Sequence, residues 1–168
     1  MTAGPAAPHE HRAQALIAAA GHALVLIAYL LPWVGGEFGP RATLSGLSLA
    51  RLAGDAAAND LGGHGASALA LRVALFAVPV LAVDALAILG GGSRLGFSTA
   101  ALHRAAVLFA LPVAAVAAAT GAVTLSAARS STLIDGLEVG WYLLVVGVAV
   151  TLSSAWIAAA ARRFRAAR

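Results

Sequence analysis

Four long stretches of almost unbroken hydrophobic residues divide the chain. They cover roughly residues 13–31, 69–89, 105–125 and 140–161. A transmembrane helix needs about 20 mostly apolar residues, because the hydrocarbon core of a bilayer is about 30 Å thick and a helix rises about 1.5 Å per residue. Each stretch is long enough to cross. The pattern therefore predicts an all-α, four-helix transmembrane bundle with up-down-up-down topology.

The segments between these stretches are unequal in length. The first outer loop, from about 33 to 67, is by far the longest, and loops of this length are usually functional or disordered. Its first half, 43–52, is apolar enough to pack on the bundle or to lie at the membrane surface. Its second half, 54–65, has the composition of a flexible linker.

The ends of the chain are short and polar. Residues 1–12 and 162–168 form two tails that we predict to lie in the cytoplasm. Four spans with such short ends leave no room for a soluble domain, so 1–168 is expected to form a single integral membrane domain.

The composition supports a membrane protein and excludes several other classes. Of the 168 residues, 61% are hydrophobic and 11% are charged, whereas soluble domains are about one quarter charged. The absence of cysteine excludes disulfides, thiol catalysis and iron–sulfur clusters. The computed pI of about 11.1 could suggest nucleic acid, but the arginines are scattered between apolar spans. No nucleic-acid partner is predicted.

The distribution of arginine predicts the orientation, since cytoplasmic flanks of membrane helices are enriched in basic residues. With the N-terminus inside, the cytoplasmic segments carry seven arginines: Arg12, Arg94, Arg104, Arg162, Arg163, Arg165 and Arg168. The opposite side carries four: Arg41, Arg51, Arg72 and Arg129. This difference predicts a multi-pass protein of the inner (plasma) membrane with both termini in the cytoplasm. The C-terminal arginines should also attract anionic lipid headgroups.

Two ionisable residues within the predicted spans form the candidate intramembrane site. Asp84 lies about one and a half turns from the cytoplasmic end of the second span, and His22 lies at a comparable depth in the first. Ionisable groups in membrane helices usually face the bundle interior or water. A His22–Asp84 pair could relay a proton or coordinate an ion. The alternative is that Asp84 is hydrated near the interface and His22 hydrogen-bonds to a neighbouring helix.

Three charged residues are candidates for contacts on the outer face. Arg72 begins the second span, where its side chain can extend toward the headgroups. Alternatively, Arg72 could pair with Glu37 or Glu138 and hold the outer loops together.

No motif predicts a catalytic, cofactor or metal site. The chain has no H-E-x-x-H motif, no G-x-S-x-G motif and no Walker A loop. The spacing of Asp55, Asp60 and His64 matches no zinc or calcium pattern. We therefore expect a protein that is not an enzyme: an accessory or scaffold protein that binds a membrane partner through its outer loop. The alternative is a small transporter or proton-conducting bundle that uses His22 and Asp84.

Three short motifs carry a resemblance to a known group. Residues 31–34 (LPWV), 44–49 (LSGLSL) and 140–142 (GWY) resemble small four-helix actinobacterial membrane proteins, among them the tryptophan-operon-associated membrane proteins. The latter tend to have two tryptophans after the proline, and Val34 takes the second place here. The resemblance covers most of the chain. It implies a topology and no catalytic residues.

Overall fold

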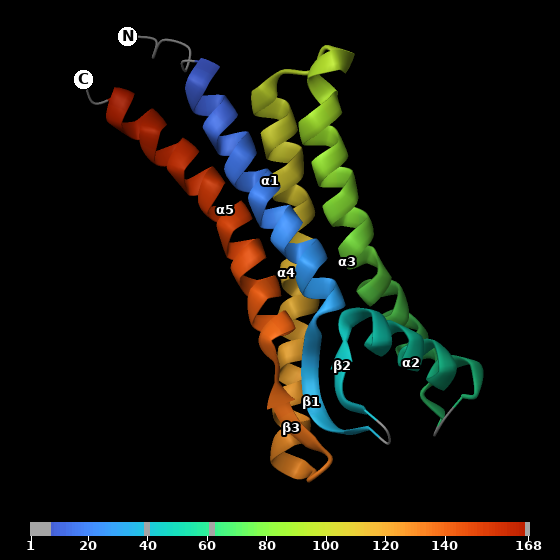
Figure 1. The fold of residues 1–168 in the computed structure, drawn as a ribbon. Coiled ribbons are helices and arrows are strands. Elements are labelled where there is room, and N and C mark those ends of the chain that lie inside the picture. The colour runs from blue at the N-terminus through green and yellow to red at the C-terminus, as the bar shows by residue number, and fades with distance from the viewer. Residues whose placement is uncertain (1–7, 39–40, 61–62, 167–168) are drawn as a thin grey trace.

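Four long helices run alongside one another in the computed structural model, which describes residues 8–38, 41–60 and 63–166 (Figure 1). They are α1 (Pro8–Leu30), α3 (Gly65–Gly91), α4 (Thr99–Ser130) and α5 (Val139–Ala166). All four are long and apolar enough to cross a membrane. The predicted all-α bundle is thus confirmed, and the chain is treated below as a multi-pass membrane protein. Both ends of the chain lie at the same end of the bundle as the α3–α4 connection.

Helix α1 is the centre of the bundle, since it packs against α3, α4 and most extensively against α5. The α1–α5 contact is close because glycines face each other. A Cβ atom placed on Gly147 would lie 2.8 Å from the carbonyl oxygen of Gly21. Small residues allow such an approach, which increases van der Waals contact between membrane helices. Below this crossing the core is apolar, with Val25, Leu75 and Leu144 fully or almost fully buried.

All four helices are longer than predicted, although α1 ends at Leu30, one residue before its predicted end. The α4 helix begins at Thr99 rather than about 105, because the Ser98 hydroxyl accepts a hydrogen bond from the amide of Ala101 and caps the helix. The α1 helix begins at Pro8 and α5 continues to Ala166, so the predicted tails are partly helical. The apolar runs mark only the part of each helix that suits hydrocarbon, whereas the helices continue through charged residues on either side.

A small sheet, which the sequence pattern did not predict, joins the α1–α3 and α4–α5 connections, which are called outer below after the predicted orientation. Its strands are β1 (Pro32–Phe38), β2 (Arg41–Ser45) and β3 (Ile134–Leu137), in the order β2-β1-β3 and with both pairs antiparallel. Val34 of β1 lies opposite Leu44 on one side and Leu137 on the other. The strands are short and two of them contain glycine, so alternation between apolar and polar residues is too weak to reveal them.

A further helix, α2 (Gly46–Ala58), follows the sheet and packs on α3. Ser45 caps α2 by accepting a hydrogen bond from the amide of Ser48. The apolar half of the outer loop therefore packs on the bundle, as expected. The linker prediction was wrong for residues 54–58, which are the last residues of α2. At the other end of the bundle, a short 3₁₀ helix, η2 (Gly92–Leu95), joins α3 to α4.

Candidate functional site

The candidate residue His22 lies on α1 and is buried inside the bundle. Its side chain is 0% exposed, and its Nε2 atom lies 2.9 Å from the carbonyl oxygen of Ala106 on α4. Because a carbonyl oxygen can only accept, Nε2 carries the hydrogen and donates it. The neutral ring then has an acceptor at Nδ1, and within the described part of the chain this atom has no hydrogen-bond partner.

A second buried histidine, His103, lies nearby on α4. Its Nε2 atom is 2.7 Å from the hydroxyl oxygen of Ser154 on α5. That hydroxyl donates its single hydrogen to the carbonyl of Thr151, at 2.6 Å, so toward the histidine it acts as an acceptor. We refer to His22, His103, Thr151 and Ser154 as the polar layer, since all four side chains are buried.

The polar layer connects α1, α4 and α5. On α4, His103 lies one turn before Ala106, whose carbonyl receives the His22 hydrogen bond. On α5, the Thr151 hydroxyl donates to the carbonyl of Gly147, which is the glycine at the α1–α5 crossing. Hydrogen bonds between membrane helices contribute about 0.6 kcal/mol each on average. The layer therefore holds three helices in register and leaves one unused acceptor, His22 Nδ1.

Asp84 lies on the outward face of α3 and does not join this layer. Its side chain is exposed, as are those of Val80 and Val83 beside it on the helix. The hydrogen bond that His22 makes goes to α4 instead. The predicted His22–Asp84 pair is thus not formed in the structure, and His22 follows the alternative in which it bonds to a neighbouring helix. An aspartate side chain is too short to turn from the outward face of its helix into the interior.

Arg72 does not take one of its two expected roles, the ion pair with Glu37 or Glu138, in the described part of the chain. Its guanidinium group lies over the ring of Phe76, 5.8 Å from the ring centroid. It also lies against α2, since a Cβ atom placed on Gly54 would be 3.0 Å from its Cζ atom. Neither Glu37 nor Glu138 forms an ion pair with it in the described parts of the chain. Arg72, which is part of α3, therefore contacts α2 and helps to hold the two helices together.

The two glutamates instead lie at the sheet, Glu37 in β1 and Glu138 directly after β3. The amide of Glu37 donates to the carbonyl of Leu133 at 2.8 Å. The amide of Glu138 donates to the carbonyl of Trp33 at 2.9 Å. Their backbone groups join the first outer connection to the second, which is the linking role that the sequence had suggested for their side chains.

The three motifs that carry the family resemblance meet where the sheet joins the bundle. The indole of Trp33 packs against Gly46 at the start of α2. Gly140 packs against the backbone at the start of β1, because a Cβ atom there would be 2.5 Å from the carbonyl oxygen of Pro32. The indole of Trp141 donates to the carbonyl of Ala117 at 3.0 Å. In this structure the motifs connect the outer sheet and α2 to the membrane helices.

Sequence reasoning missed most of the polar layer. The apolar pattern places the start of the third span at about 105, after Arg104, and so leaves His103 outside it. The Ser98–Thr99 pair is a helix-start signal that would have placed His103 in the first turns of α4. The three-residue spacing of Thr151 and Ser154, which puts both hydroxyls on one face of a helix, was a second usable signal.

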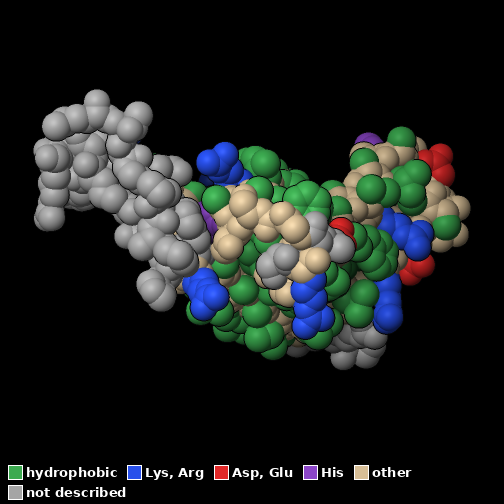
Figure 2. Space-filling view, turned by 90° about the horizontal axis from the view of Figure 1, so that it is seen from above, with side chains coloured by type: hydrophobic (Ala, Val, Ile, Leu, Met, Phe, Trp, Pro, Cys, Tyr) green, Lys and Arg blue, Asp and Glu red, His purple; other side chains and the backbone are tan. Residues whose placement is uncertain are grey.

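Figure 2 shows the end of the bundle that carries the termini. Hydrophobic side chains cover most of this view, with arginine side chains spaced between them. Acidic, basic and histidine side chains gather on the lobe at the right, which is formed by α2 and its connection to α3. Within this connection Asp60 accepts a hydrogen bond from the amide of Gly65 at 2.8 Å and so supports the start of α3.

No protein-family model, curated protein or solved structure matches the chain.

Proposed function

We propose that this chain is a non-enzymatic accessory or scaffold protein that binds a partner membrane protein through the outward face of α3. One observation carries the proposal: Asp84 is exposed on the side of a membrane helix. An ionised side chain at the centre of such a helix costs about 2.5–3.5 kcal/mol, and such groups rarely face lipid. A partner that covers Asp84 would remove this cost.

The depth of Asp84 supports this argument. Seven residues, 85–91, follow Asp84 before α3 ends at Gly91, which corresponds to about 10 Å along the helix axis. All of these seven residues are apolar or glycine. The carboxylate therefore lies about two helical turns along an apolar segment from the end of α3.

The surroundings of Asp84 indicate what kind of partner would fit. Phe76, Val80 and Val83 are exposed on α3. An apolar surface with one acceptor at its end suits a transmembrane helix that brings a basic or hydrogen-bond-donating side chain to the carboxylate.

The outer sheet and α2 offer a second contact for the same partner. Because β1 pairs with both β2 and β3, the sheet holds the two outer connections together. Leu52 on α2 and Leu133 before β3 are large apolar side chains that stay exposed there. The outer-loop contact expected from the sequence would thus be made by a folded platform rather than by a flexible segment.

The orientation in this proposal rests on the arginines. We place the chain in the inner (plasma) membrane with both termini in the cytoplasm, where the arginine-rich end of α5 would contact anionic headgroups. Arg12, Arg94, Arg104 and Arg163 are all exposed, as headgroup contact requires.

The transporter alternative has less support. A conducting path needs polar groups that face one another, and here His22 is enclosed while Asp84 faces outward. Among the described residues, the hydroxyls of the polar layer are already bonded to carbonyls of their own helix.

A site-specific cross-linking experiment tests the proposal. A photoreactive residue such as p-benzoylphenylalanine is placed at Val80, one turn from Asp84 and 57% exposed. A matched control carries it at Leu111, which is 51% exposed on α4. After irradiation of native membranes, we expect one stoichiometric protein adduct from position 80 and none from position 111.

Variants at Asp84 then decide whether the carboxylate is responsible. Asp84→Leu should abolish the adduct, and Asp84→Asn should retain part of it because an amide still accepts a hydrogen bond. The thermal stability of the isolated protein should stay nearly unchanged, since the side chain is exposed and forms no hydrogen bond or ion pair with the described residues. Adducts with lipid alone, an adduct with a second copy of this chain, or an adduct that survives Asp84→Leu would each overturn the proposal.

A further inference from the structure

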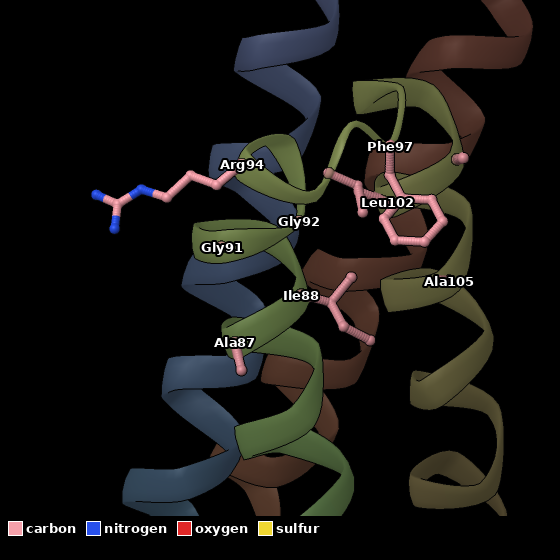
Figure 3. Close-up of a pocket in the computed structure, with 9 residues that line it drawn as sticks. Ala87, Ile88, Gly91, Gly92, Arg94, Phe97, Leu102 and Ala105 are labelled. Atoms are coloured by element: carbon pink, nitrogen blue, oxygen red, sulfur yellow. The ribbon is translucent and has the colours of Figure 1, made fainter.

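A pocket lies between the end of α3, η2 and the start of α4, at the end of the bundle that carries the termini (Figure 3). Its volume is about 710 Å³. Pockets that hold small molecules usually have volumes of about 300–1,000 Å³. The side chains of Ile88 and Leu102 point into the space between the two helices, whereas Arg94 extends away from it at the rim.

The walls of the pocket determine the chemistry of its ligand. Apart from Arg94, the lining consists of apolar residues and glycine, including Ile88, Phe97 and Leu102. A polar metabolite would lose its hydration there without gaining hydrogen bonds. A hydrocarbon chain has no hydrogen bonds to lose on entering the pocket, and it gains van der Waals contacts with the walls.

The position of the pocket and its one charge indicate the source of that chain. The pocket lies where the apolar part of the bundle ends, and Phe97 at its edge is 59% exposed. Arg94 is exposed at the same level. We propose that the pocket binds an acyl chain of an anionic phospholipid, with Arg94 contacting the phosphate of the headgroup.

Gly91 leaves the space open. A Cβ atom placed on Gly91 would have no heavy atom within 4 Å apart from its own helix and its two chain neighbours. At the next residue, Gly92, a Cβ atom would lie 3.2 Å from Cγ of Leu102, so the two helices are in contact there. Both glycines line the pocket, and only at Gly91 is there room for a side chain.

A pocket-filling variant tests the acyl-chain site. Gly91→Leu places a side chain in the pocket, and the matched control Gly90→Leu places one in open space outside the lining. The purified full-length chain is titrated with dioleoyl phosphatidylglycerol, and bound lipid is counted by native mass spectrometry. Exclusion of two or three methylenes should weaken binding roughly 15- to 50-fold in Gly91→Leu, with no change in Gly90→Leu.

An exchange of headgroup tests the role of Arg94. The same titration with dioleoyl phosphatidylcholine should give weaker binding to the unmodified protein. Arg94→Gln should weaken phosphatidylglycerol binding roughly fivefold, because one arginine near anionic lipid is lost. Arg129→Gln, which removes an exposed arginine in the last turn of α4, far from the pocket, should leave it unchanged.

Two results would overturn the proposal. Equal binding to Gly91→Leu and Gly90→Leu would show that the lipid lies elsewhere on the protein. Equal binding of the two lipids by the unmodified protein would show that no headgroup charge is recognised. Thermal unfolding of each variant, measured without added lipid, confirms that the comparison is made between folded proteins.

Discussion

The indole ring of Trp33 lies directly against the backbone of Gly46. A Cβ atom placed on Gly46 would be 2.9 Å from Cζ2 of the indole and 2.7 Å from Cδ2 of Tyr29. The two aromatic rings pack edge to face with centroids 5.9 Å apart. Because both rings are buried, neither can move aside easily. The start of α2 therefore approaches α1 only because residue 46 has no side chain.

Gly46→Ala should loosen α2 from the bundle. Overpacking of a buried contact costs about 1–3 kcal/mol. Hydrogen exchange of the α2 amides should accelerate by roughly 5- to 150-fold, since each 1.4 kcal/mol corresponds to about a factor of ten. Exchange measured in detergent micelles checks this. Gly90→Ala, where a Cβ atom meets nothing within 4 Å, is the control and should leave α2 unchanged.

Trp33 should contribute more to stability than any exposed tryptophan of the chain. It is fully buried, and its indole N–H donates to the carbonyl of Ala28 at 2.7 Å, which satisfies an acceptor in the last turn of α1. Trp33→Ala should lower the free energy of unfolding by about 3–5 kcal/mol. Trp156→Ala, at a side chain that is 79% exposed, should change it by less than about 1 kcal/mol. Denaturation in mixed micelles measures both, and similar losses would contradict the assignment.

The hydrogen bond between His103 and Ser154 should appear as a coupling energy. A double-mutant cycle with His103→Ala and Ser154→Ala isolates this pair from other contacts of either residue. Hydrogen bonds of this kind average about 0.6 kcal/mol in membrane proteins, with a maximum of about 1.7 kcal/mol. We expect a coupling in this range from unfolding in micelles. Strictly additive losses would show that the bond does not form.

The four spans were predictable because burial in hydrocarbon imposes a simple requirement on every residue of a long segment. Asp84 and His22 were also recognisable as unusual, since each interrupts an apolar run. What the pattern could not give was the direction in which each side chain points. On α3, with exposed valines and leucines on one side and buried ones on the other, apolar residues face both ways, so periodicity does not separate lipid from interior.

The outer sheet was unpredictable for a different reason. Its middle strand pairs with segments on both sides, and the β3 partner lies about 100 residues away in the chain. Nothing local in β1 indicates this contact. The α2 helix, in contrast, had a visible start: Ser45 precedes Gly46, and Ser48 follows at the spacing of a capping hydrogen bond. Its residues were interpreted as a loop because they lie between two membrane spans.

Arg72 allows a last prediction, which separates the two roles considered for it. If the guanidinium fastens α2 to α3 through Phe76 and Gly54, Arg72→Ala should speed exchange of the α2 amides by roughly two- to fivefold, because a cation–π contact at an exposed site contributes about 0.5–1 kcal/mol. Glu37→Gln and Glu138→Gln should leave α2 exchange unchanged. An equal acceleration by either glutamate variant would instead support the ion pair, because then the loss of either partner would release the same helix.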